Sequence, residues 1–196
     1  WYSRPVFVLP LLALLVGIAY GLVERVSIHY VWVSVALYCG GMFVACMFCH
    51  GEMAALRPSP RYLTRFYLML SVGGAAGGLF VGLVAPSLFN AYLEMPYALV
   101  ALAALLFVVS MGPQAPRKPA RFVIPGLAIV VTAVTAYYAH QYQYWLGRQA
   151  LVLNRNFYGT LSVKQDDDPN APGATRRLVH GMINHGSQLI DPEKRM

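Results

Sequence analysis

Charged residues are scarce in this chain. Asp, Glu, Lys and Arg make up only 12% of its 196 residues, about half the share found in soluble domains. Hydrophobic residues reach 58% and fall in runs of about 18 or more, the length that crosses a hydrocarbon core about 30 Å thick. The composition therefore excludes an ordinary soluble domain and indicates an integral membrane protein.

Acidic and basic residues are both missing from the middle of the apolar runs. Ionisable side chains at membrane depth typically mark an ion or proton pathway, so their absence argues against a transporter. The net charge of +7 would suggest nucleic acid in a soluble protein. Here the basic residues gather at the ends of the runs without an interleaved aromatic surface. We therefore expect contact with membrane lipids, anionic headgroups above all, and no nucleic acid.

Cysteine is rare too, and an odd count of three excludes a complete disulfide framework. Cys46, Cys49 and His50 match the C-x-x-C-H signature of c-type haem attachment. The match closes an apolar helix, where thiols are poorly accessible, and lies on the side that the basic residues assign to the cytoplasm. We therefore disfavour haem, expect no cofactor or metal, and interpret the cysteines as small, reduced helix residues.

Proline and charge clusters divide the apolar sequence into five predicted spans. The spans cover residues 5–23, 30–50, 62–88, 96–112 and 122–145. Clusters such as Arg57-Pro-Ser-Pro-Arg61 cannot sit in lipid, where freed backbone groups find no partners, and Pro86 is expected to bend or end the third helix. The predicted fold is an all-α transmembrane bundle of about five helices over residues 1–147. A small β-hairpin-rich extramembrane tail follows over residues 148–196.

Basic residues flank the spans unevenly. Seven fall on one side of the membrane, namely Arg4, Arg57, Arg61, Arg65, Arg117, Lys118 and Arg121. Only Arg25 falls on the other side before the tail. The positive-inside rule assigns the richer side to the cytoplasm. With five spans in a bacterial inner membrane, the N-terminus is then cytoplasmic and the tail periplasmic.

Glycines at four-residue spacing mark two predicted helices. The candidate packing residues are Gly17, Gly21, Gly73, Gly74, Gly77, Gly78 and Gly82. A phosphate-binding loop is the alternative for the longer row, but it needs a preceding strand and a following Lys-Ser/Thr, which this row lacks. Small residues at this spacing let a second helix approach closely. The sequence leaves open whether each face meets a helix of the same chain or of another subunit.

A polar group lies where the second span ends. It consists of His50, Glu52, Arg57, Arg61 and Arg65. A proton relay through the His and the acid is one interpretation. At the membrane interface, however, the acid can pair with the arginines at little cost, so we expect a structural hydrogen-bond cluster on the cytoplasmic face.

Strand signals dominate the tail. Residues 157–164 alternate and are aromatic-rich, residues 165–175 have a turn composition, residues 176–183 fit a return strand, and residues 185–188 begin a third strand. The candidate partner-docking residues of this sheet are Phe157, Tyr158, His180, His185 and Gln188. Three consecutive carboxylates in the loop fit a solvated turn better than a calcium loop.

Two of these blocks resemble a known family. The stretch from Cys49-His50-Gly51-Glu52 to Phe89, and the tail from Asn154 to Arg195, resemble bacterial membrane-embedded spermidine-synthase-like proteins. In that family a helical membrane region precedes a polyamine aminopropyltransferase domain, so the resemblance implies that the tail is the small N-terminal sheet of such a domain. The family's Asp-Gly-x-x-Gln run corresponds to His185-Gly-Ser-Gln188, with His for Asp and one residue fewer before Gln.

The catalytic parts of that family do not occur in this sequence. They comprise the Gly-rich donor loop, the acidic residue for the donor ribose and the catalytic Asp. We therefore expect a non-catalytic accessory or scaffold subunit of a larger bacterial membrane complex, of the respiratory or photosynthetic type. It would pack on other integral membrane subunits and dock through its periplasmic tail. The alternative is the N-terminal part of a membrane-tethered polyamine aminopropyltransferase.

Overall fold

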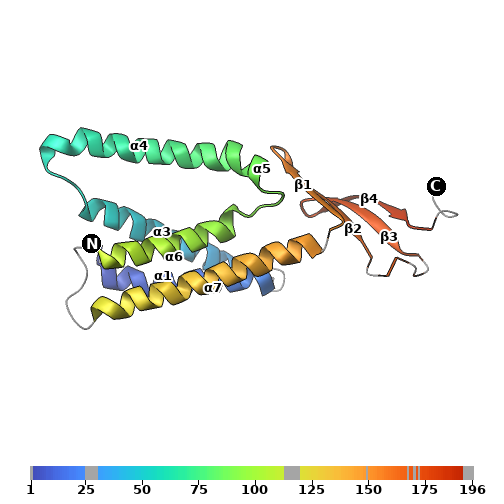
Figure 1. Ribbon diagram of the computed structural model, residues 1–196, viewed down its shortest axis with the longest axis horizontal. Helices are drawn as coiled ribbons and strands as arrows, with labels where there is room; N and C mark the ends of the chain where they lie inside the picture. The colour runs from blue at the N-terminus through green and yellow to red at the C-terminus, as the bar shows by residue number, and fades with distance from the viewer. Residues whose placement is uncertain are drawn as a thin grey trace. The chain divides into compact units, whose positions relative to one another are not determined.

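The computed structural model describes residues 2–24, 31–112, 120–148, 150–166, 168–169, 171 and 173–191, without the side chains of residues 120 and 121. Its elements are labelled in Figure 1. Arg25, Arg117 and Lys118, which enter the predicted orientation, lie outside the described residues, as does the Arg121 side chain.

The described chain is mostly helical, with five helices long and apolar enough to cross a membrane. They are α1 (Arg4–Glu24), α3 (Val31–Ala55), the run Pro60–Leu88, α6 (Glu94–Met111) and α7 (Ala120–Arg148). This confirms the five predicted helices and is consistent with a multi-pass membrane protein. The structure extends α3 beyond residue 50 to Ala55, and α7 beyond residue 145 to Arg148.

Two compact units make up the chain. Unit 1 comprises Trp1–Leu70 and Met95–Tyr142, and unit 2 comprises Ser71–Glu94 and Gln143–Met196. Unit 1 therefore contains α1, α3, most of α6 and most of α7, and unit 2 contains the end of the third run and the tail.

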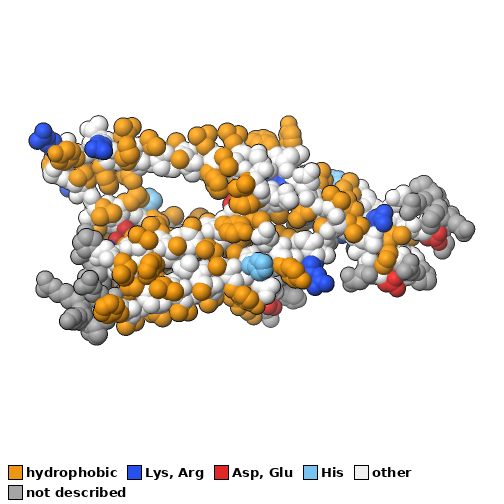
Figure 2. All heavy atoms as spheres, viewed as in Figure 1, with side chains coloured by type: hydrophobic (Ala, Val, Ile, Leu, Met, Phe, Trp, Pro, Cys, Tyr) orange, Lys and Arg blue, Asp and Glu red, His pale blue; other side chains and the backbone are white. Residues whose placement is uncertain are grey.

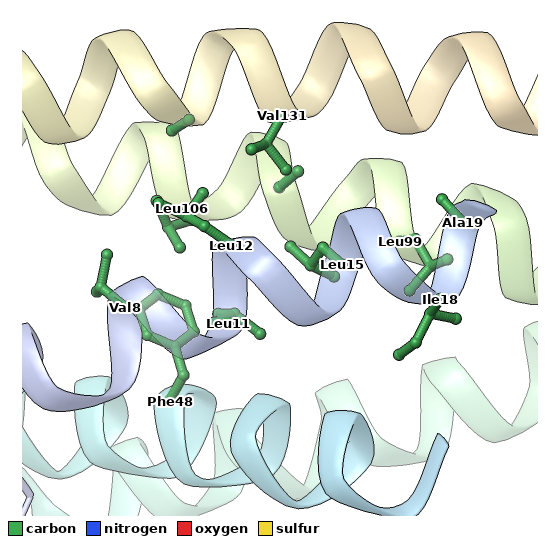
Figure 3. Packing of buried hydrophobic residues seen from close by; sticks show 12 residues of the cluster. Val8, Leu11, Leu12, Leu15, Ile18, Ala19, Phe48, Leu99, Leu106 and Val131 are labelled. Carbon is green, nitrogen blue, oxygen red and sulfur yellow. The ribbon is translucent and has the colours of Figure 1, made fainter. Parts of the chain in front are cut away.

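The core of unit 1 is built around α1. Its buried members come from four helices and are Val8, Leu11, Leu12, Leu15, Ile18, Ala19, Phe48, Leu99, Ala103, Leu106, Ala128 and Val131. Figure 3 shows Phe48 of α3 reaching toward Val8 and Leu11 of α1, and Leu106 of α6 reaching toward Leu12. Lipid tails are as apolar as these side chains, so the helices are held together by close van der Waals packing.

The run Pro60–Leu88 changes its helix type along its length. It begins with the 3₁₀ turn η1 (Pro60–Tyr62), continues as α4 (Leu63–Leu79), widens into the π-helical segment η2 (Phe80–Val84) and ends as α5 (Ala85–Leu88). Pro86 has no N–H, and its ring would clash with the carbonyl one turn earlier. The π segment directly before it accommodates that clash, so the helix continues through the proline to Leu88.

The tail in unit 2 forms one antiparallel sheet in the order β1-β2-β3-β4. Its strands are β1 (Val152–Asn156), β2 (Gly159–Gln165), β3 (Thr175–His180) and β4 (Ile183–Leu189). β1 has no counterpart among the predicted strands. The prediction that Phe157 and Tyr158 begin a strand is wrong, because they form the β1–β2 turn.

Local hydrogen bonds explain these turns. The side-chain oxygen of Asn156 accepts the N–H groups of Tyr158 (2.9 Å) and Gly159 (3.2 Å), so the chain reverses where the aromatic pattern suggested extension. The predicted return strand over residues 176–183 likewise ends at His180, and Gly181 takes a φ of 61°, which favours glycine. The chain then reverses into β4.

Candidate functional site

The glycine face of α1 is filled by α3. A Cβ added to Gly17 would lie 3.3 Å from Cδ1 of Leu37, and one added to Gly21 would lie 3.5 Å from its Cδ2. On the facing helix, a Cβ at the buried Gly41 would collide with the Ile18 side chain. Gly17 and Gly21 of α1 therefore pack against a helix of the same chain.

The glycines of the third run have different surroundings. Gly73, Gly74, Gly77, Gly78 and Gly82 are all exposed, and within unit 2 no described atom lies within 4 Å of a Cβ added at any of them. No residue of α4 is buried. Figure 2 shows hydrophobic side chains along this helix. The longer glycine row is thus an open face within its own unit.

Glu52 anchors the end of α3 to the start of α1. It is only 6% exposed. Its Oε1 accepts hydrogen bonds from the Tyr2 hydroxyl (2.6 Å) and from Nε of Arg4 (2.7 Å), and Oε2 forms an ion pair with Nη2 of Arg4. The predicted pairing of Glu52 with Arg57, Arg61 or Arg65 is wrong. The antiparallel packing of α1 on α3 brings Arg4 to the carboxylate instead.

Tyr2 completes this anchor. Burial and the hydrogen bond that it donates to the Glu52 carboxylate raise the pKa of the Tyr2 hydroxyl. Its ring stacks on Phe7 with 5.5 Å between centroids, and it leaves no room for a side chain at the buried Gly51. Gly51 in the C-H-G-E run therefore allows an aromatic ring to lie directly against α3.

The other predicted interface residues are dispersed. Nδ1 of His50 lies 3.1 Å from the carbonyl oxygen of Cys46, and the Arg61 guanidinium lies 5.8 Å from the Tyr62 ring centroid. Arg57 and Arg65 form no ion pair with any described residue. All three cysteines are free. Across the described part of the chain, no three His, Cys, Asp or Glu side chains gather in a way that would hold a metal.

The predicted docking residues of the tail form two aromatic pairs. Phe157 and Tyr158 project from the β1–β2 turn, 75% and 85% exposed, with ring centroids 5.8 Å apart. The His180 and His185 rings lie 5.7 Å apart across the β3–β4 turn. Gln188 pairs with Arg176 in the strand register.

One carboxylate of the acidic loop has a structural role. Asp166 accepts hydrogen bonds from the N–H (2.8 Å) and hydroxyl (2.9 Å) of Thr175 and pairs with Arg177 at 2.7 Å. These donors, the Thr175 N–H first, lower the pKa of Asp166. Asp167 lies outside the described residues.

Arg155 is the polar residue of unit 2 that the sequence analysis missed. Its side chain is 6% exposed, donates to the Ala91 carbonyl (2.9 Å) and pairs with Glu94 (2.5 Å). Its guanidinium also lies 4.3 Å from the Tyr92 ring centroid, in cation–π contact. The only sequence signal is a basic residue between two asparagines in a short alternating stretch.

A cavity of about 410 Å³ adjoins Arg155 within unit 2. Its lining residues are Gly82, Leu83, Pro86, Ser87, Asn90, Asn154, Arg155, Asn156 and Phe157. The cavity thus joins the end of the third run to the edge strand β1.

No protein-family model, curated protein or solved structure matches the chain. The resemblance to spermidine-synthase-like proteins therefore stays a prediction. The architecture described above rests on the sequence and the structure alone.

Proposed function

We propose that this chain is a non-catalytic integral membrane subunit that packs through α4 onto helices of a larger bacterial membrane complex. The observation that carries the proposal is the open glycine face of residues 73–78. The equivalent face of α1 is filled by α3. Complexes of the respiratory or photosynthetic type are the expected hosts.

Packing energetics support a helix as the partner of α4. Each glycine inside a helix costs about 0.5–1 kcal/mol relative to alanine. The row of glycines in α4 therefore destabilises the helix unless a close contact offsets that cost. In lipid such a contact comes from a facing helix backbone, because lipid chains are mobile and pack less closely than a fixed helix surface.

The proposed orientation places the N-terminus in the cytoplasm and the tail in the periplasm of a bacterial inner membrane. The Arg4–Glu52 pair supports one part of this, since it brings the start of α1 and the end of α3 to the same side. Arg57 and Arg61 follow directly after α3. The exposed Phe157–Tyr158 turn then offers a periplasmic contact for a partner subunit.

Purification from native membranes in mild detergent, followed by mass spectrometry of the intact particle, tests the proposal. We expect the chain to co-migrate with a fixed set of larger subunits. Replacing Gly77 and Gly78 with Leu should abolish co-migration and leave membrane insertion intact. The control is Ala76→Leu, which places a leucine on a different side of α4. Unchanged assembly of the double variant would contradict the packing role.

One observation favours a second candidate, a membrane-tethered polyamine aminopropyltransferase. The four-stranded antiparallel sheet that follows α7 is the kind of element that the resemblance implies. The same purification distinguishes the two candidates. A native polypeptide heavier than 21.6 kDa that transfers aminopropyl groups to a polyamine would replace the scaffold proposal.

A further inference from the structure

The cavity beside Arg155 has an apolar wall and a polar wall. Gly82, Leu83 and Pro86 belong to the run that is apolar enough to cross a membrane and that ends at Leu88. The polar wall comes from the last turn of this run, the residue Asn90 just beyond it, and β1. It includes Ser87, Asn90, Asn154, Arg155 and Asn156. An amphipathic molecule at the edge of the hydrocarbon core would meet a matching surface with each of its ends.

The polar wall holds more donors than its own hydrogen bonds use. The amides of Asn90 and Asn154 make no side-chain hydrogen bond to any described residue. Asn156 uses its oxygen for the β1–β2 turn, which leaves its NH₂ group as a donor. Nε of Arg155 is buried and has no hydrogen-bond partner among the described residues. Buried donors in native proteins are normally satisfied, so the unpaired Nε of Arg155 indicates a missing acceptor. The three asparagine amides of the wall are exposed and can donate to the same acceptor.

The charge of the wall indicates which acceptor fits. Among the described residues of the lining, Arg155 alone is charged, and its ion pair with Glu94 is made through Nη2. A phosphodiester offers negative oxygens that only accept, which suits a wall of amide N–H groups and one guanidinium. The asparagine amides also carry acceptor oxygens, so it is the charge of Arg155 that favours an anion over a sugar or a free amide. We propose that this cavity binds the phosphodiester headgroup of a glycerophospholipid, with an acyl chain against Gly82, Leu83 and Pro86.

The location favours a lipid over a soluble phosphate, because the apolar wall is part of a membrane-length helix. The absence of a Cβ at Gly82, with no described atom of unit 2 within 4 Å of that position, leaves room for a chain to lie on the helix backbone. Basic pockets beside membrane helices commonly hold anionic headgroups. This site does not depend on whether α4 packs against a partner.

Lipid retention by the full chain in detergent, measured by native mass spectrometry, tests the proposal. The probes are phosphatidylglycerol, a diacylglycerol with the same chains, and glycerol 1-phosphate. Phosphatidylglycerol should be retained, and each of the other two should bind at least about ten-fold more weakly, since each lacks one half of the ligand. Equal retention of phosphatidylglycerol and diacylglycerol would overturn the headgroup assignment. Equal binding of glycerol 1-phosphate would overturn the lipid assignment.

Variants separate binding from folding. The double variant Asn90→Leu with Asn154→Leu leaves the Arg155 ion pair in place and should weaken phosphatidylglycerol retention about ten-fold. Glu94→Gln keeps an acceptor oxygen for Arg155 but removes the competing negative charge. It should therefore strengthen retention several-fold, a gain that a purely structural role of Arg155 would not produce. Gln188→Leu removes an amide of the same sheet outside the cavity lining and is the matched control. Unchanged retention in both test variants would refute the site, whatever the assembly experiment shows.

Discussion

Units 1 and 2 each contain a glycine-bearing helix and a buried Arg–Glu pair, but they use them differently. In unit 1, Gly17 and Gly21 lie against α3, and Arg4–Glu52 joins the ends of the same two helices. In unit 2, Arg155 of β1 pairs with Glu94, the first residue of α6, and the glycines of α4 remain open within the unit. Glycine spacing therefore determines how closely another helix can approach. It does not determine which helix fills the face.

Removing the acid of the unit 1 pair has the largest expected effect. Glu52→Leu leaves Arg4 without its carboxylate partner at the end of the α1–α3 contact. Breaking such a pair costs about 3–5 kcal/mol when it is fully buried, and we expect about 3 kcal/mol because the Arg4 side chain can extend toward headgroups. Unfolding by SDS in mixed micelles, followed by circular dichroism, measures the change. A loss below about 0.5 kcal/mol would mean that the pair contributes little to unit 1.

The two glycine faces should then respond differently to the same substitution. Gly17→Leu overpacks the contact with Leu37 and should lower the free energy of unfolding by about 1–3 kcal/mol. Gly77→Leu should leave the free energy of unfolding of the isolated chain within about 0.5 kcal/mol, because its position has no neighbour to displace within unit 2. The same SDS titration compares both variants. An equal loss in the two variants would show that the α4 face is also filled in the isolated chain.

Removing the aromatic contact of Arg155 should have a smaller effect. Tyr92→Leu removes the cation–π contact with Arg155 but keeps both the ion pair and the bond to Ala91. We expect a loss of about 1 kcal/mol in the local stability of β1. Hydrogen exchange of the β1 amides measures it, with Tyr158→Leu as a control at an exposed aromatic outside the pair. Faster exchange in Tyr158→Leu but not in Tyr92→Leu would contradict a role of Tyr92 in holding Arg155 and β1 in place.

Acid sensitivity of the sheet is the smallest predicted effect. The pKa of Asp166 is lowered by its Thr175 and Arg177 donors, so its contribution is fully present above the ordinary pKa of about 3.9. That contribution is lost as pH falls through the lower folded-state pKa. Hydrogen exchange of the Thr175 amide as a function of pH should show this loss. Asp166→Asn should remove this pH dependence of the exchange rate. If the pH dependence persists in the variant, another titratable group causes it.

The sequence predicted the membrane helices well because long apolar runs have few alternative structures. The strands were harder to predict. β1 is a polar edge strand with the sequence Val-Leu-Asn-Arg-Asn, so it lacks the apolar alternation that marks a half-buried strand. The Phe157–Tyr158 turn has strand-forming residues, and a single side-chain interaction from Asn156 reverses the chain there.

The polar contacts were predictable only as residue types. Glu52 was expected to be paired, but its partner lies 48 positions away at the start of the chain. Arg155 and Glu94 are similarly distant, 61 positions apart. Such pairings depend on which helix or loop the fold brings close, and no local spacing encodes that choice.

The π segment before Pro86 acts as a one-residue insertion in an otherwise α-helical run. Its hydrogen bonds reach five residues back, so four residues no longer complete a turn there. One additional residue turns everything that follows by about 100° around the helix axis. Pro86 and its neighbours in α5 are therefore turned away from the row that Gly74 and Gly78 begin, with Gly82 inside the π segment between them. One continuous helix thus presents two differently directed surfaces. Deleting a single residue from Phe80–Val84 would realign them into one stripe and merge the two binding faces proposed for this helix.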